Sequence, residues 1–256
     1  MKVITLANQK GGCGKTTTAQ LLSVGLVNKG FNVLAIDCDA QCNLSSVFGL
    51  MSSNKTKGTL LDVMNQEADI SDCVYKIKIG LDVLSGNPKL NNADKMYSEF
   101  EDITILNDAL EKVKNKYDYV VIDTPPAVNV LTTSALMTSD YLIVPMTADY
   151  FSIQGFNLLQ KKVASLKKIG SNIEILGILL TRYDRTSITS TLAENVEQIA
   201  KELNTTLFES TIRQGVAIRE SQLLQSDIFT ESPKSKVALE YSSFVDEVIQ
   251  RISERS

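Results

Sequence analysis

The sequence of 256 residues contains no histidine. This absence excludes imidazole acid–base catalysis, Ser-His-Asp hydrolysis and metal binding through histidine. Any catalysis must therefore depend on carboxylates, lysines and a bound metal ion. Cysteine is also scarce, because only four thiols are present and none forms a Cys-x-x-Cys pair: Cys13, Cys38, Cys42 and Cys73. Such spacing favours reduced thiols of the kind found in the cytosol.

We also expect neither a membrane span nor a leader, and the composition is not strongly basic. No apolar run approaches the roughly 20 residues that a span requires, and Met1-Lys2 leads directly into an apolar run. A formal net charge of -4 excludes a surface covered with positive charge, so binding to nucleic acid would need a local basic patch. We expect a cytoplasmic protein without a membrane partner, built as a single domain over residues 1–256.

The sequence does contain a regular alternation of two patterns. Short apolar runs that are typical of buried strands occur at residues 3–7, 31–37, 119–123, 141–145 and 173–181. Segments with apolar residues at helical spacing lie at 21–26, 103–113, 159–166, 192–203 and 237–252. This alternation predicts an α/β fold with a single doubly wound, mostly parallel sheet and helices on both faces. Two further runs, at 74–79 and 81–84, predict short strands around Gly80.

The most informative stretch lies between the first strand and the first helix, and reads Lys-Gly-Gly-Cys-Gly-Lys-Thr-Thr. Its glycines allow positive φ and let the backbone wrap closely around an anion. The first N–H groups of the following helix lack partners within the helix and point at the same anion. The loop is therefore predicted to hold nucleotide phosphates through Lys10, Gly11, Gly12, Cys13, Gly14, Lys15, Thr16 and Thr17.

Spacing within the loop assigns a role to several side chains. Lys15 is placed to reach the β- and γ-phosphates, Thr16 to offer its hydroxyl to Mg²⁺, and Thr17 to contact the α-phosphate. Asp123 ends an apolar strand and is predicted to hold the same Mg²⁺ through water, which is the Walker B role.

Hydrolysis also needs a group that orients the attacking water. Asp37 and Asp39 follow the second strand, at the edge where parallel sheets place their ligands, and both are candidates.

The loop departs from the general P-loop pattern, which would need a glycine at Asn8 or Gln9. It carries a second lysine, Lys10, directly before the glycines. In this respect it resembles the deviant Walker A motif of the ParA/Soj/MinD family of ATPases. Further segments resemble that family in the same order along the chain: Asp39-Ala-Gln-Cys-Asn43 for the usual Asp-Pro-Gln-Gly-Asn, Val121-Ile-Asp-Thr-Pro-Pro126, and Pro145 through Gly155.

The resemblance implies a P-loop enzyme that binds ATP and Mg²⁺ and hydrolyses ATP to ADP and phosphate. Lys10 would reach across an ATP-sandwich homodimer into the active site of the partner subunit. Asp39 would activate or position the attacking water, and Asp37 would support the metal shell. The implied catalytic residues are Lys10, Lys15 and Asp39, and the implied metal residues are Thr16, Asp37 and Asp123.

The resemblance also implies macromolecular partners. ParA-type dimers bind DNA non-specifically and segregate plasmids or chromosomes together with a ParB-type centromere-binding protein. The expected location is the cytoplasm, on the nucleoid when ATP is bound. The family segment Pro-Arg-Asn-Val-Arg-Leu-Ser-Glu-Ala corresponds to residues 212–221, which indicates Arg213 and Arg219 as DNA-binding residues, although the second family arginine falls on Ala217.

Three alternatives remain open. A cluster of four lysines forms either a solvated helix face or a second DNA contact, and consists of Lys161, Lys162, Lys167 and Lys168. The chain is alternatively an ATPase of the same fold that positions a protein complex without binding DNA. A metabolic P-loop enzyme is the third alternative, either a dethiobiotin-synthetase-like ligase or an iron–sulfur ATPase, although cysteines with cluster spacing are missing.

The last helical segment, 237–252, mixes acidic with basic residues on its polar side. An anionic membrane would gain little from such a surface. We therefore expect this segment to pack against the core.

Overall fold

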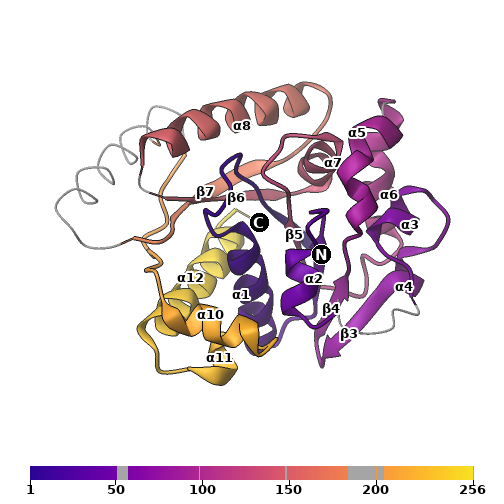
Figure 1. The fold of residues 1–256 in the computed structure, drawn as a ribbon. Coiled ribbons are helices and arrows are strands. Elements are labelled where there is room, and N and C mark those ends of the chain that lie inside the picture. The colour runs from indigo at the N-terminus through magenta and orange to yellow at the C-terminus, as the bar shows by residue number, and fades with distance from the viewer. Residues whose placement is uncertain (51–56, 98, 148, 184–199, 201–204, 256) are drawn as a thin grey trace.

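A computed structural model describes residues 1–50, 57–97, 99–147, 149–183, 200 and 205–255. A seven-stranded sheet runs through its centre in the order β3-β4-β2-β5-β1-β6-β7 (Figure 1). The strands are β1 (Lys2–Leu6), β2 (Val33–Asp37), β3 (Val74–Lys78), β4 (Leu81–Leu84), β5 (Tyr119–Asp123), β6 (Tyr141–Met146) and β7 (Glu174–Leu180). All neighbouring pairs are parallel except β3 and β4. The predicted doubly wound, mostly parallel sheet is confirmed.

The antiparallel pair is the predicted hairpin around Gly80. This glycine has a φ of 82°, a left-handed conformation that residues with a Cβ rarely adopt. The sequence therefore places the turn correctly, and the sheet gains an antiparallel edge strand.

Successive side chains of each strand point to opposite faces of the sheet, so each strand supplies two cores. On β2, Val33 and Ala35 belong to one cluster, whereas Leu34 and Ile36 belong to the other. The first face is covered by α1 (Lys15–Asn28), α2 (Asn43–Val47), α10 (Val216–Leu223), α11 (Ile228–Glu231) and α12 (Lys236–Ser253) (Figure 1). The second face is covered by α3 (Leu60–Met64), α4 (Ile70–Cys73), η1 (Pro88–Asn92), α5 (Ala93–Met96), η2 (Glu101–Thr104), α6 (Ile105–Glu111), α7 (Val130–Thr138) and α8 (Tyr150–Lys168).

Several helices escaped the periodicity analysis, and α7 shows why. Its polar residues Thr132, Thr133 and Ser134 are buried together with its apolar residues, so the sequence has no solvent-facing period. The predicted helix over 192–203 lies outside the described residues, apart from position 200. Within the described part of the chain, no helix combines the length and the apolar character that crossing a bilayer requires.

Helix α12 packs against the core as predicted. Its N-terminus is capped by Ser235, whose hydroxyl oxygen accepts a hydrogen bond from the backbone N–H of Ala238 at 3.3 Å. Its apolar stripe is buried against α1, and the hydroxyls of Tyr241 and Thr18 share a buried hydrogen bond of 3.2 Å. This contact fixes α12 beside the helix that begins at the phosphate loop.

Candidate functional site

The phosphate loop joins the end of β1 to the start of α1 at Lys15. Gly12 and Gly14 have φ values of 73° and 88°, which explains why both positions carry glycine. Gly11 differs from the prediction, because its φ is not positive and a Cβ at this position would meet nothing within 4 Å. Cys13 is buried in the loop, and burial raises the pKa of its thiol, which therefore stays protonated at neutral pH.

Two side chains from outside the motif hold the loop in place, and the sequence analysis gave neither of them this role. The amide of Asn8 donates to the carbonyl of Pro145 at 2.7 Å, and its oxygen accepts the N–H of Lys10 at 3.1 Å. The hydroxyl of Thr181 donates to the carbonyl of Cys13 at 2.7 Å. The ends of β6 and β7 thereby anchor the loop. This support comes from residues that are distant in the sequence, so a local sequence pattern does not reveal it.

Thr16 and Asp123 meet at the first turn of α1, as the predicted metal site requires. The hydroxyl of Thr16 donates to Oδ2 of Asp123 at 2.6 Å. The other carboxylate oxygen, Oδ1, is buried and has no hydrogen-bond partner among the described residues. Burial, followed by the neighbouring charge of Asp37, raises the pKa of Asp123. A cation at this point would offset both the missing hydrogen bond of Oδ1 and the cost of burying a charged carboxylate.

The donor set fits Mg²⁺. Mg²⁺ is usually held by one or two carboxylates together with phosphates and water, not by a cage of protein ligands. Accordingly, the described residues contain no group of three or more His, Cys, Asp or Glu side chains that could hold a metal ion by itself. The available oxygens, from Thr16 and Asp123, match a nucleotide-bound magnesium ion.

Asp37 and Asp39 lie on neighbouring parts of the same sheet edge but in different environments. Asp37 pairs in register with Asp123 and is fully buried, and its oxygens accept bonds from the N–H of Asp39 at 3.1 Å and from the N–H and hydroxyl of Ser45, both at 2.7 Å. Burial raises the pKa of Asp37 to about 6, although the bonds from Ser45 oppose the shift. Asp39 instead lines the cleft beside the phosphate loop.

The loop after Asp39 forms a tight turn in which a residue other than glycine is left-handed. Cys42 stands where the family has glycine, and its φ of 54° is left-handed. Oδ1 of Asp39 accepts the N–H of Gln41 at 2.9 Å, which closes the turn. Gln41 and Asn43 line the same cleft as Asp39, so the structure brings together the three polar side chains retained from the family segment.

The cleft over the phosphate loop has a volume of about 300 Å³. Its walls combine the loop with the residues after β2, β5 and β7, and consist of Gly11, Gly12, Gly14, Lys15, Thr16, Thr17, Asp39, Gln41, Asn43, Pro126 and Arg182. Lys15 is buried in this wall, and its Nζ donates to the carbonyl of Lys10 at 3.2 Å. The cleft presents N–H groups, an ammonium group and hydroxyls to an anion.

A second, smaller hollow of about 130 Å³ lies next to this cleft. The two share Gly14, Thr17 and Arg182. The smaller hollow is also lined by Arg213 and Arg219, the residues predicted to bind DNA. The structure thus places both arginines beside the phosphate loop.

Arg213 is engaged within the protein. Its Nε donates to Glu240 at 2.6 Å, and its backbone N–H donates to the same carboxylate at 2.9 Å. This pair neutralises much of the charge that Arg213 would offer to a DNA phosphate.

Lys10 also has a partner within its own chain. Its Nζ donates to Thr147 at 3.0 Å and forms an ion pair with Asp149. The predicted reach of Lys10 into a partner subunit therefore requires that this ion pair open.

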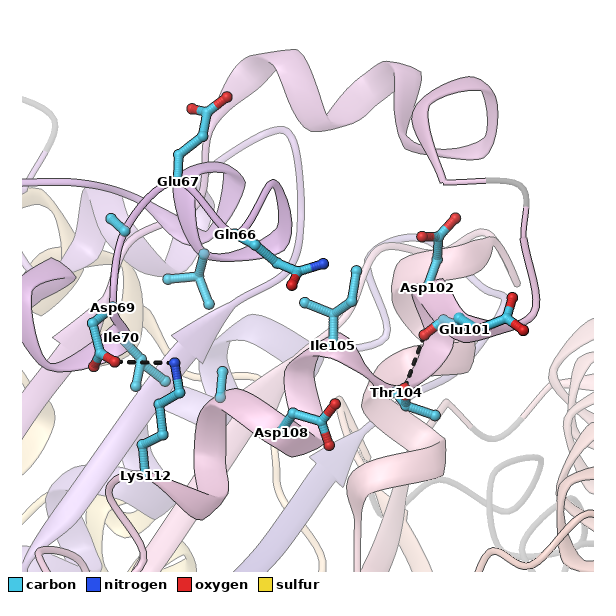
Figure 2. A pocket seen from close by; sticks show the side chains of 13 residues that line it. Gln66, Glu67, Asp69, Ile70, Glu101, Asp102, Thr104, Ile105, Asp108 and Lys112 are labelled. Atoms are coloured by element: carbon cyan, nitrogen blue, oxygen red, sulfur yellow. Dashed lines mark hydrogen bonds and ion pairs between the residues drawn. The ribbon is translucent and has the colours of Figure 1, made fainter.

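A hollow with a larger volume, about 590 Å³, lies elsewhere, on the face covered by α3 to α6 (Figure 2). Carboxylates dominate its lining: Glu67, Asp69, Glu101, Asp102 and Asp108. Lys112 is turned toward Asp69, with Nζ at 3.1 Å from its carboxylate. Because this hollow would repel phosphates, size alone does not identify the nucleotide site.

Comparison with known proteins agrees with this geometry. A family described as AAA domain matches residues 1–175. The chain is also 32% identical over 264 residues to the chromosome partitioning protein ParA of Caulobacter vibrioides, in an alignment that covers 100% of this chain and 96% of that protein. The chain belongs to the ParA/MinD family of partition ATPases.

Two solved structures are similar to this ParA-family chain over their whole length. The cobyrinic acid a,c-diamide synthase from Mycobacterium smegmatis, solved with ADP and magnesium, has a TM-score of 0.86 at 25% identity and covers 100% of this chain and 97% of that one. A plasmid partition protein from Borrelia burgdorferi, solved with AMPPNP, has a TM-score of 0.78 at 26% identity and covers 100% of this chain and 99% of that one. Both relatives were solved with a nucleotide bound.

Proposed function

We propose that the chain is a Mg²⁺-dependent ATPase that dimerises around ATP and drives plasmid or chromosome partition. The observation that carries the proposal is the hydrogen bond from Thr16 to Asp123 at the phosphate loop, with the second oxygen of Asp123 left for a cation. The ADP and magnesium of one structural relative, and the partition role named for others, support it.

In this proposal, each polar residue of the cleft has one role in phosphoryl transfer. The N–H groups at the start of α1 and the ammonium of Lys15 hold the β- and γ-phosphates. Thr16 and Asp123 hold Mg²⁺, which would neutralise charge on those phosphates. Asp39, in the wall of the same cleft, orients the attacking water. Asp37 supports this arrangement from beneath, since it accepts the N–H of Asp39.

Lys10 supplies positive charge to the active site of a partner subunit in this proposal, as an arginine finger does in trans. In the free chain its ammonium is paired with Asp149. Hydrolysis then depends on dimerisation, because the site lacks this charge until a second copy provides it.

Variants of Lys10 and Asp39 test the proposed ATPase activity. Lys10→Ala should bind ATP without hydrolysing it, and Asp39→Ala should accumulate an ATP-bound dimer, as measured by phosphate release and by sedimentation. Lys89→Ala, at an exposed position of η1, is the matched control and should behave as the wild type. Normal turnover in Lys10→Ala, or a strictly monomeric ATP-bound Asp39→Ala, would contradict the sandwich dimer.

The proposal extends to DNA and to a ParB-type centromere-binding partner. The ATP dimer binds duplex DNA through phosphate contacts, which places the protein on the nucleoid, and hydrolysis stimulated by the partner releases it. Binding to random-sequence duplex, measured with ATP, with ADP and without nucleotide, should occur only with ATP and should weaken steeply as salt rises.

A second candidate is an ATPase of the same fold that positions a protein complex without binding DNA. It is favoured by the ion pair between Arg213 and Glu240, which occupies one of the two arginines proposed for DNA. ATP turnover without DNA binding in any nucleotide state would support this candidate and would contradict the partition role.

A further inference from the structure

Arg182 lies in the wall of the proposed nucleotide cleft. It is the second residue after β7, and its φ of 52° is left-handed, a conformation that is uncommon for residues other than glycine. The preceding Thr181 donates hydrogen bonds to two other residues. Its backbone N–H donates to the carbonyl oxygen of Met146 at 2.8 Å, and its hydroxyl donates to the carbonyl oxygen of Cys13 at 2.7 Å. The backbone therefore holds Arg182 against the phosphate loop.

The side chain of Arg182 lies across the loop. Its Nη1 is 3.8 Å from the position that a Cβ on Gly12 would take. Arg182 lines both the cleft of about 300 Å³ and the hollow of about 130 Å³, together with Gly14 and Thr17. Arg182 is thus one of three residues that line both hollows.

The charge of Arg182 is not neutralised within the described part of the chain. The side chain is exposed, and no hydrogen bond or ion pair to another described residue involves its guanidinium. Arg213, Arg251 and Arg255 differ, since each forms an ion pair with a glutamate of this chain. An exposed guanidinium that faces a cleft built for phosphates is matched to an anionic ligand, because its planar fork pairs with phosphate oxygens.

We infer that Arg182 is a nucleotide-binding residue whose guanidinium pairs with the α-phosphate of the bound nucleotide. This inference rests on the proposed function, in which the cleft holds ATP. The α-phosphate is favoured over the others because Arg182 lines both hollows together with Thr17, whose place in the loop assigns it to that group. Lys15 and the helix N-terminus already serve the β- and γ-phosphates.

A contact with the α-phosphate is made equally by ATP, ADP and AMP. Losing it weakens the binding of all three by a similar factor and leaves the rate of hydrolysis at saturating ATP nearly unchanged, because the contact is the same in the ground state and the transition state. One charge-assisted hydrogen-bonded pair at an exposed site corresponds to a factor of about ten in Kd.

Titration calorimetry of the full chain with ADP and a non-hydrolysed ATP analogue, and competition by AMP, test the inference. Arg182→Ala should weaken all three ligands about tenfold, and Arg182→Lys should recover part of the loss, whereas kcat should stay within about twofold. Arg255→Ala is the matched control, since it removes an arginine that pairs with Glu174, at the opposite end of β7. Thermal unfolding of each variant without nucleotide verifies that it is folded.

The outcomes separate this inference from the proposed function. If the wild type binds nucleotide and Arg182→Ala binds it equally well, the inference is wrong and the proposed function stands. Weaker binding of the ATP analogue alone, or of ADP but not AMP, would assign Arg182 to another phosphate and overturn the inference. A loss of kcat at unchanged Kd would make it a hydrolytic group, which also contradicts the inference. Absence of nucleotide binding by the wild type would overturn both.

Discussion

Gly25 lies in the last turn of α1, where the helix packs against α12. A Cβ built on this glycine would be 2.5 Å from Cγ2 of Val245 and 3.3 Å from its Cβ and Cγ1. Carbon atoms in contact are normally about 3.5 to 4.0 Å apart, so the two helices would have to separate by about 1 Å. Val245 is fully buried, and close packing in a protein core resists such a movement.

The expected effect of Gly25→Ala combines two opposing contributions. Overpacking of a filled core costs about 1 to 3 kcal/mol, whereas replacing glycine by alanine within a helix contributes about 1 kcal/mol in the other direction. We expect a net loss of up to about 2 kcal/mol in the free energy of unfolding. For a chain of this length, each kcal/mol corresponds to about 2 to 4 °C in Tm.

Urea unfolding of four proteins tests this reasoning: the wild type, Gly25→Ala, Val245→Ala and the double variant. Val245→Ala removes the two methyl groups that clash with the added Cβ, so the double variant should be more stable than the sum of the single effects by at least about 1 kcal/mol. Gly11→Ala serves as the control, because a Cβ there meets nothing within 4 Å and should leave the nucleotide-free protein as stable as the wild type. Single effects that simply add in the double variant would refute the argument, because they would show no clash between the new Cβ and Val245.

Three further predictions concern the site. Asp123→Asn should lower Mg²⁺-dependent ATP hydrolysis by about 100-fold, because Thr16 then faces an amide where a carboxylate had been, and the test is a magnesium titration of the ATPase rate. Asp37 should make the folded state bind a proton more strongly than the unfolded chain, because its pKa is raised from 3.8 to about 6. As pH rises from 4 to 7, the stability of the wild type relative to Asp37→Asn should therefore fall by up to about 3 kcal/mol, measured by urea unfolding. Asp149→Asn should free Lys10 and raise ATPase activity at low protein concentration by up to about fivefold, since a partly exposed ion pair contributes at most about 1 kcal/mol.

Each of these expectations has a contradicting result. Unchanged hydrolysis in Asp123→Asn would remove this residue from the metal site. A wild type that gains stability relative to Asp37→Asn as pH rises would mean that Asp37 is held in its charged form by its hydrogen bonds. An Asp149→Asn variant with the ATPase rate and dimerisation of the wild type would show that the ion pair with Lys10 does not oppose assembly.

The sequence predicted the sheet well because buried strands have a local signature. The run at 119–123 matches β5 residue for residue, the run at 141–145 is one residue shorter than β6, and the run at 3–7 is shifted by one residue from β1. Continuous apolar runs persist in such strands because both faces of the sheet are covered. Helix α7 lacked a comparable signal, since a helix with buried threonines has neither a polar face nor a long apolar stripe.

The sequence predicted those parts of the proposed nucleotide site whose residues are neighbours along the chain. Gly12, Gly14, Lys15 and Thr16 belong to one strand–loop–helix unit, and their spacing alone sets their geometry. Asp123 lies far away in the chain but ends a strand of the same parallel sheet, so its position at the same edge followed from the fold class.

The tertiary structure alone decided which side chains support and surround that site. The ties from Thr181 and Asn8 to the loop, the pairing of Lys10 with Asp149, and the position of Arg182 all join segments more than a hundred residues apart. Local propensity also gives the wrong sign at position 25, where alanine favours the helix but collides with α12. Phosphate chemistry is encoded in short spacings along the chain, whereas packing and charge pairing depend on which distant segments the folded sheet brings together.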